Sequence, residues 1–195
     1  MPITKASALA NGATHSSTIG NARTLRAPPA RRREDALAVL VADHARIAQL
    51  FERFDGLESS GPRKASIVLR LCDEIDVHSR IEEEIFYPSV RAALARDDVV
   101  DAAAVEHETA RAMTGQLRLL RPGDLHYDAK VRVLGEYVRH HVEVEEDAIF
   151  PHALAMDADL VALGRALKAR RRQLHLAGGG RRRFALIACP GSAGA

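Results

Sequence analysis

The chain is poor in cysteine and in aromatic residues. Its 195 residues include two cysteines, no tryptophan and only 4% aromatic residues. Neither Cys72 nor Cys189 has a partner at C-x-x-C spacing, which argues against a disulfide framework and fits a reducing cytosol. No run of 18 apolar residues occurs, and the first residues lack the apolar stretch of a signal peptide. The sequence therefore predicts a cytoplasmic protein with no membrane-spanning helix.

Neither sign of charge is in large excess, but the charges are unevenly distributed. The net charge is +2, from 28 basic and 26 acidic side chains. Arginine runs lie towards the two ends of the chain, at 31–33, 170–172 and 181–183. They contain no interleaved aromatic residues and no known nucleic-acid-binding motif. We therefore interpret them as solvated segments and do not expect nucleic acid or membrane as a partner.

The most informative feature is a segment that occurs twice. HSRIEEEIFYP at 78–88 returns 63 residues later as HVEVEEDAIFP at 141–151. In both copies a histidine precedes a glutamate by four positions, and a proline follows six residues after that glutamate. Four residues is about one helical turn, so the histidine and glutamate of each copy share one helix face. Burying them on an otherwise apolar face is costly unless something binds them, and a metal ion is the obvious candidate.

A lone histidine precedes each copy by 34 residues. His44 lies this far before His78, and His107 lies this far before His141. Each half of the chain therefore predicts one helical hairpin, with a histidine on its first helix and HxxxE on its second. Facing each other, the two hairpins would bring four histidines and two glutamates to one point.

Hydrophobic residues recur at the three-to-four-residue spacing of amphipathic helices. Clusters of Gly, Ser and Pro separate the periodic stretches. The predicted helices are about 34–56, about 62–88, about 97–121, a fourth that reaches Pro151, and a short fifth from Asp159 to about Leu174. The predicted fold class is all-α, an up-down-up-down four-helix bundle built from two repeated helical hairpins, with a short extra C-terminal helix and disordered tails.

The predicted domain organisation has three parts. Residues 1–33 form a disordered N-terminal arm, and residues 34–173 form the bundle. Residues 174–195 form a poorly ordered C-terminal tail, because the glycines at 178–180 are expected to end the fifth helix.

Regular periodicity makes two further predictions within the repeated segments. Ile85 and Ala148 would share the inward face with the glutamates. Pro88 and Pro151 would kink or end their helices, because proline removes a backbone donor and clashes with the preceding turn.

The predicted site is a dinuclear metal centre. Four imidazoles and two carboxylates suit a pair of iron ions, with open positions for a bridging oxygen and a small ligand. By the symmetry of the repeat, the two histidines of each half would hold one ion, and one glutamate from each half would bridge the ions. A single zinc ion would need only three or four of these ligands. The predicted metal ligands are His44, His78, Glu82, His107, His141 and Glu145.

This pattern, H…HxxxE…H…HxxxE from Asp43 to about Pro151, resembles the hemerythrin-like (HHE cation-binding) family. The resemblance implies a non-haem di-iron centre, with an oxo or hydroxo bridge, that meets oxygen, peroxide or nitric oxide. In the oxygen-carrying hemerythrins that this pattern resembles, a fifth histidine is expected one turn after the third-helix ligand, where this chain has Arg111. Arginine cannot ligate iron, so we expect a more open site, with Arg111 paired with a carboxylate such as Glu145 or directed out of the bundle.

The residues that follow each glutamate point away from the predicted site. We interpret them as a solvated face, with Glu83 and Glu146 as candidate hydrogen-bonding partners of the ligands. Tyr87 and Phe150 are interpreted as core packing, although the Tyr87 hydroxyl could line a ligand channel. Cys72 is interpreted as a small buried residue.

Three functions remain open at this point. The first is a di-iron binding module that senses or stores oxygen, nitric oxide or iron. The second is an oxidoreductase that decomposes peroxide, as a catalase does, or reduces nitric oxide at the same centre. The third, a metal-free helical interaction protein, is disfavoured by the repeated motif. No residue is assigned a catalytic role, and the missing fifth histidine favours peroxide or nitric oxide chemistry over oxygen transport.

Overall fold

The computed structural model describes residues 35–57, 61–92, 98–155 and 158–187, with side chains to residue 178. Within these ranges the chain is helical and contains no strand, which confirms the predicted all-α class. The predicted N-terminal arm at 1–33 and the segment 188–195 lie outside the described residues. None of the described helices is long and apolar enough to cross a membrane.

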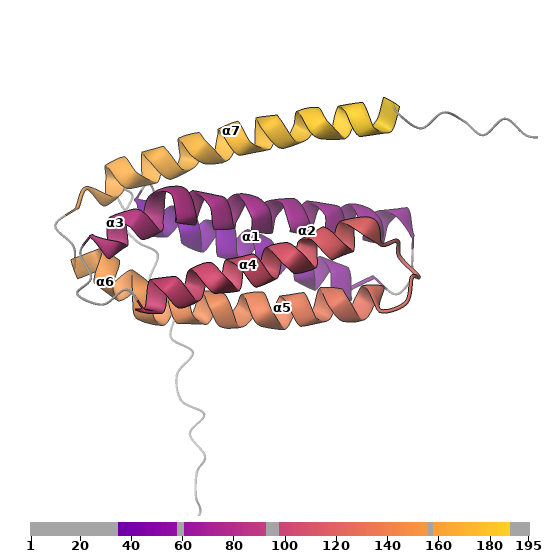
Figure 1. Cartoon of the computed structure of the whole chain (residues 1–195), viewed down its shortest axis with the longest axis horizontal. Helices are drawn as coiled ribbons and strands as arrows, with labels where there is room; N and C mark the ends of the chain where they lie inside the picture. The colour runs from indigo at the N-terminus through magenta and orange to yellow at the C-terminus, as the bar shows by residue number, and fades with distance from the viewer. Residues whose placement is uncertain (1–34, 58–60, 93–97, 156–157, 188–195) are drawn as a thin grey trace, which may run out of the picture.

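Four helices form the predicted bundle (Figure 1). They are α1 (Ala36–Asp55), α2 (Pro62–Ile81), α4 (Asp98–Leu119) and α5 (Tyr127–Val144). Each packs against the next along the chain, and α5 packs against α1 to close the ring. Short connections between successive long helices enforce this up-down-up-down order.

Local signals explain where these helices begin. Asp35 caps α1, because its carboxylate accepts a hydrogen bond of 2.8 Å from the backbone N–H of Ala38. Pro62 opens α2, where its missing N–H costs nothing, and Asp98 and Asp101 lie in the first turn of α4, where negative charge is favourable. Gly123, with φ of 100°, allows the tight turn between α4 and α5.

The two repeated segments contain π-helical turns that the sequence did not predict. After α2 comes η2 (Glu82–Phe86) and then α3 (Tyr87–Arg91). After α5 comes η3 (Glu145–Ile149) and then α6 (Phe150–Ala155). Each π turn begins at the glutamate of its HxxxE motif, and π turns of this kind occur frequently at functional sites.

The prolines do not end these helices, contrary to one of the two predicted outcomes. The N–H of Tyr87 bonds to the carbonyl of Glu82, five residues back, and the N–H of Phe150 bonds in the same way to Glu145. The next residue in each case is a proline, which has no N–H to continue the ladder. The π turn therefore occupies the place where proline disturbs the hydrogen bonding of a regular α-helix.

One extra residue in each π turn moves the following side chains out of the predicted register. Phe86 and Tyr87 are buried, whereas Ile85 is only partly buried. Ile149 is likewise fully buried, and Ala148 is only partly buried. The predicted inward positions of Ile85 and Ala148 are therefore wrong by one residue, because regular helical periodicity does not continue through a π turn.

The apolar core has two clusters, with the polar side chains of the repeat between them. Along α1 the inward residues run from Leu40 in the first cluster, through His44, to Ile47 in the second. The second cluster includes the fully buried Cys72, as predicted. Near it, Gly135 allows close approach of α5 to α1, because a Cβ there would lie 3.1 Å from the Phe51 ring.

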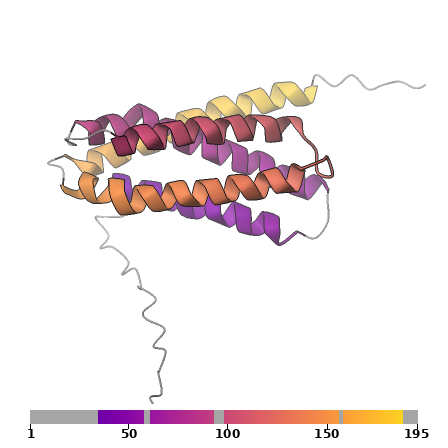
Figure 2. The same cartoon turned by 60° about the horizontal axis from the view of Figure 1, so that its bottom comes forward.

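The fifth long helix is much longer than predicted. α7 (Leu160–Ile187) has 28 residues and lies along the α1–α2 side of the bundle (Figures 1 and 2). Leu163, Leu167 and Leu174 pack into the first core cluster. The glycines at 178–180 do not end the helix, although each glycine lowers helix propensity by about 1 kcal/mol. The segment predicted as a poorly ordered tail is thus helical as far as Ile187.

Candidate metal centre

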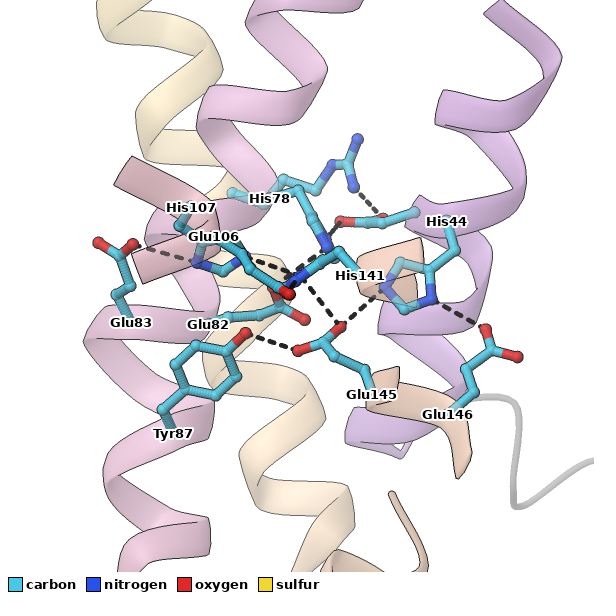
Figure 3. Close-up of polar contacts among 12 residues, drawn as sticks. His44, His78, Glu82, Glu83, Tyr87, Glu106, His107, His141, Glu145 and Glu146 are labelled. Atoms are coloured by element: carbon cyan, nitrogen blue, oxygen red, sulfur yellow. Dashed lines mark hydrogen bonds and ion pairs between the residues drawn. The ribbon is translucent and has the colours of Figure 1, made fainter. Parts of the chain in front are cut away.

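The structure brings all six predicted ligands together in the interior of the bundle (Figure 3). Each of the four bundle helices supplies one histidine, and the glutamates are the first residues of the two π turns. All six side chains are buried, and the two glutamates have no exposed surface. The members of this centre are His44, His78, Glu82, His107, His141 and Glu145.

The Nε2 atoms of the four histidines face the glutamate oxygens. Oε2 of Glu82 lies 3.1 Å from Nε2 of His78 and 3.3 Å from Nε2 of His107. Oε2 of Glu145 lies 3.2 Å from Nε2 of His44 and 3.7 Å from Nε2 of His141. Each glutamate therefore contacts histidines from both halves of the repeat through its Oε2 atom.

The Nδ1 atoms face outward, each towards an acidic side chain. Glu146 lies 2.9 Å from Nδ1 of His44, and Glu83 lies 3.1 Å from Nδ1 of His107. Both pairs cross from one half of the repeat to the other, since Glu83 belongs to the first half and His107 to the second. Glu83 and Glu146 thus take the partner role for which the sequence made them candidates.

Two further acids complete this outer set, and the sequence analysis did not assign them a role. Glu106 lies 2.7 Å from Nδ1 of His141, and Asp43 lies 3.9 Å from Nδ1 of His78. The repeat offered a signal for both, because each acid directly precedes a predicted histidine ligand at equivalent positions. A carboxylate behind a histidine fixes the ring orientation and makes Nε2 a better metal ligand.

The two buried glutamates differ in their electrostatic environment. Burial, the nearby charge of Glu145 and other acids raise the pKa of Glu82 well above its usual range. Burial also disfavours ionised Glu145, but His44, His141 and the Tyr87 hydroxyl outweigh it and lower the pKa of Glu145 to about 2. The Tyr87 hydroxyl donates a 2.6 Å hydrogen bond to Oε1 of Glu145. Tyr87 is thus both core packing and part of the centre.

The histidines also differ. Burial and the charges of the other three histidines lower the pKa of His78 well below its usual range. Burial acts in the same direction on His44, but contacts with Glu145 and Glu146 outweigh it and raise the pKa of His44 to about 9. At neutral pH, His44 is therefore protonated and charged, whereas His78 is neutral.

The donor set fits metal binding because its inward atoms lack other partners. Within the described residues, His44 Nε2, His78 Nε2, both oxygens of Glu82 and Oε2 of Glu145 are buried and form no hydrogen bond. Unpaired buried polar atoms are costly, and a cation at their centre would satisfy them together. The 3.0 Å between Nε2 of His107 and Nε2 of His141 suits two adjacent ligands of one ion, since metal–nitrogen distances are about 2.1 Å.

The geometry offers two overlapping groups of candidate ligands, each with ligand atoms within 4.8 Å of one another. One group combines His107 and His141 with Glu82 and His78. The other group combines His44, His78, Glu82 and Glu145. The two groups have His78 and Glu82 in common, so two cations held by them would lie side by side.

Arg111 does not enter the centre. Its guanidinium donates a 2.5 Å hydrogen bond to Oε1 of Glu83, the same oxygen that contacts Nδ1 of His107. The suggested pairing of Arg111 with Glu145 is therefore replaced by pairing with Glu83. Arg111 acts on His107 only through that carboxylate, and the position one turn after His107 supplies no ligand.

Comparison with known proteins agrees with this architecture. The profile described as "Hemerythrin HHE cation binding domain" matches residues 35–153. The fold is similar to the crystal structure of a hemerythrin HHE cation binding domain-containing protein from Mycobacterium kansasii, with a TM-score of 0.67 and 23% identity. The similarity covers 76% of this chain and 92% of that chain.

A relative from Nostoc sp. (strain PCC 7120) is described as a DNA nickase. It is 26% identical to this chain over 113 residues, which is 57% of this chain and 31% of the relative. The chain thus spans about a third of that relative's length.

Proposed function

Because the chain belongs to the hemerythrin HHE cation-binding domain family, we propose that it holds two iron ions and binds a small oxidant at them. The oxidant would be oxygen, peroxide or nitric oxide. The observation that carries the proposal is the convergence of four imidazole Nε2 atoms and two buried glutamates on one point. Nitrogen and oxygen donors in this number suit iron, and two shared carboxylates offset the charge of two adjacent cations.

The assignment of roles follows the contacts. His44 and His78 would bind one ion, and His107 and His141 would bind the other. Glu82 and Glu145 would bridge the ions, since each contacts histidines from both halves. When bound, the iron pair supplies redox chemistry and open coordination positions.

The protein itself restricts what can reach the centre. A cavity of about 10 Å³ is lined by three of the four histidines and by apolar side chains such as Ile47, Ile75 and Val138. This is close to the smallest space that admits one water-sized molecule, so the cavity selects a small ligand. Nearby, the Tyr87 hydroxyl holds a proton at Oε1 of Glu145, where it orients that carboxylate.

Iron analysis tests the proposal directly. Protein expressed with iron should contain two iron ions per chain and show oxo-to-iron charge-transfer bands. Zero or one ion would contradict it.

Adding peroxide and recording oxygen release would then distinguish an enzyme from a binding module. The second candidate function is peroxide decomposition or nitric oxide reduction. It is favoured by Arg111, which stands at the position expected for a fifth histidine in an oxygen carrier and pairs with Glu83 instead of entering the centre.

Metal uptake is expected to release protons. The pKa of His44 is raised to about 9, so at pH 7 this histidine carries a proton that a metal ion must displace. We expect protons to be released from His44 and from Glu82, whose pKa is also raised, and metal affinity to increase as pH rises. Zinc titration calorimetry at pH 7, in two buffers with different ionisation enthalpies, measures the release. Identical heats in both buffers would contradict the raised pKa.

A further inference from the structure

Helix α7 completes a partly buried charge cluster beside the metal centre. The cluster consists of Asp43 and Arg46 on α1, Glu74 on α2 and Arg171 on α7. Arg171 pairs with Asp43 and, at 2.5 Å, with Oε2 of Glu74. The cluster is balanced, with two carboxylates and two guanidiniums. Asp43 and Glu74 are almost fully buried, so the loss of either arginine would leave an uncompensated buried charge.

The same cluster reaches His78. Both Arg46 and Arg171 bind Oδ1 of Asp43, which leaves Oδ2 directed to the other side. Within the part of the chain that the structure describes, Oδ2 makes no hydrogen bond and lies 3.9 Å from Nδ1 of His78, which is also buried and makes none. These two atoms face each other, so a small rotation of the His78 ring or of the Asp43 carboxylate would bring them within hydrogen-bond distance.

The second half of the repeat has no equivalent arrangement. Glu106 occupies the place of Asp43 and already lies 2.7 Å from Nδ1 of His141. Within the described residues Glu106 pairs with no arginine, and the residue equivalent to Arg46 is Thr109. Glu106 therefore contacts His141 without an arginine partner among the described residues, whereas Asp43 is held in place by Arg171 of α7.

We propose that Arg171 is a positioning residue that couples the docking of α7 to one of the two metal positions, through Asp43. By holding Oδ1, it keeps Oδ2 directed at His78, whose Nε2 then binds the ion shared with His44. The proposal rests on the dinuclear centre proposed above. With His78 assigned to the same ion as His44, the two metal positions are unequal, because only that position depends on the fifth helix.

Cobalt titration of the metal-free full-length chain tests the proposal, with the absorption of bound Co²⁺ as the readout. We expect two binding steps, the stronger at His107–His141. In Arg171→Gln the weaker step should lose affinity by about tenfold, within the range typical of outer-sphere partners, while the stronger step changes less than about twofold. Asp43→Asn should have a similar effect. The double variant should bind Co²⁺ no more weakly than Asp43→Asn alone, since both changes remove the same Arg171–Asp43 interaction.

Arg170→Gln is the matched control. Arg170 is the neighbouring residue on α7 and pairs with Glu84 instead of Asp43. If α7 supported the centre only through general docking, Arg170→Gln and Arg171→Gln would weaken binding alike, and that result would overturn the proposal. Equal losses in both steps, or unchanged binding in Arg171→Gln, would also overturn it. If Arg171→Gln failed to fold by circular dichroism, Arg171→Lys would replace it, because an ammonium group cannot hold both carboxylates as the planar guanidinium does.

The wild-type titration separates this proposal from the proposed function. If the wild-type chain binds fewer than two Co²⁺ ions, the dinuclear centre itself is wrong. If it binds two and the variants behave like wild type, only the role of Arg171 is wrong. Linkage also requires the reverse effect, so Co²⁺ should slow hydrogen exchange in α7 of the wild type and not in Asp43→Asn. Equal slowing in both proteins would contradict the coupling.

Discussion

Replacing Glu82 with glutamine is expected to lower metal binding and to stabilise the metal-free protein. Glu82 contacts His78 and His107, one from each half, so its loss affects both metal positions. A neutral amide oxygen is a weaker ligand than a carboxylate. Iron content should fall from two ions to one or fewer per chain, measured by iron analysis. With Glu145→Gln added, the absorption spectrum of the dinuclear centre should disappear.

The stability of the metal-free variant should change in the opposite direction. The raised pKa of Glu82 means that its ionised form is disfavoured in the folded state. This penalty is absent below pH 4.5, the ordinary pKa of glutamate, and grows as pH rises above it. At neutral pH we expect Glu82→Gln to raise the free energy of unfolding by up to about 3 kcal/mol, since each pH unit above 4.5 contributes at most about 1.4 kcal/mol. Near pH 4 the variant and the wild type should be alike.

Glu145 and Glu143 provide the comparisons. The pKa of Glu145 is lowered to about 2, so its charge stabilises the metal-free fold above pH 4.5 and that contribution is lost as pH falls through 2. Glu145→Gln should therefore destabilise the metal-free protein at neutral pH. Glu143 is exposed near the end of α5, and Glu143→Gln should change neither metal binding nor stability. Destabilisation by Glu82→Gln at neutral pH would show that the two glutamates have been assigned the wrong way round.

Replacing Phe86 with alanine is expected to cost about 3–5 kcal/mol of unfolding free energy, as is usual for a deleted core phenylalanine. Phe86 has no exposed surface and contacts the rings of Tyr87 and Phe150. The measurement is urea unfolding of the metal-free protein, followed by circular dichroism. A cavity beside Tyr87 should also loosen the hydrogen bond to Glu145 and weaken metal binding.

The neighbouring residue tests the π turn that brings Phe86 inward. Ile85 would be buried if the helix were regular, but it is only partly buried here. Ile85→Ala should therefore cost less than the roughly 2–5 kcal/mol of truncating a fully buried isoleucine, and about 1 kcal/mol is expected. If Ile85→Ala were as costly as Phe86→Ala, the register after Glu82 would be that of a regular helix.

The six residues of the centre could be proposed from sequence because the evidence is repeated. A histidine and a glutamate four residues apart need only helical geometry to share a face, and the 63-residue repeat shows that both halves do so. The bundle followed from periodicity and from turn residues such as Gly56 and Pro62. Helical periodicity and turn residues are both local signals, so they can be recognised without a structure.

The π turns and the role of α7 could not be predicted in the same way. Periodicity shows a smooth helix, and one inserted residue shifts Phe86 and Tyr87 inward without changing the composition of the segment. Arg171 and Asp43 lie far apart in the sequence, and nothing in the arginine run shows which member pairs with a buried carboxylate. These features arise from packing between distant segments, and only the spacing from glutamate to proline hinted at the first.

The crossed pairs of Glu83 with His107 and Glu146 with His44 have a consequence for the ancestry of such a chain. Each hairpin supplies the supporting acid for a histidine of the other, so a single hairpin would have an incomplete centre. Two identical hairpins related by a twofold rotation would satisfy every one of these contacts reciprocally. The contacts between the two halves of the repeat thus resemble the interface of a symmetric dimer whose two subunits are joined in one polypeptide.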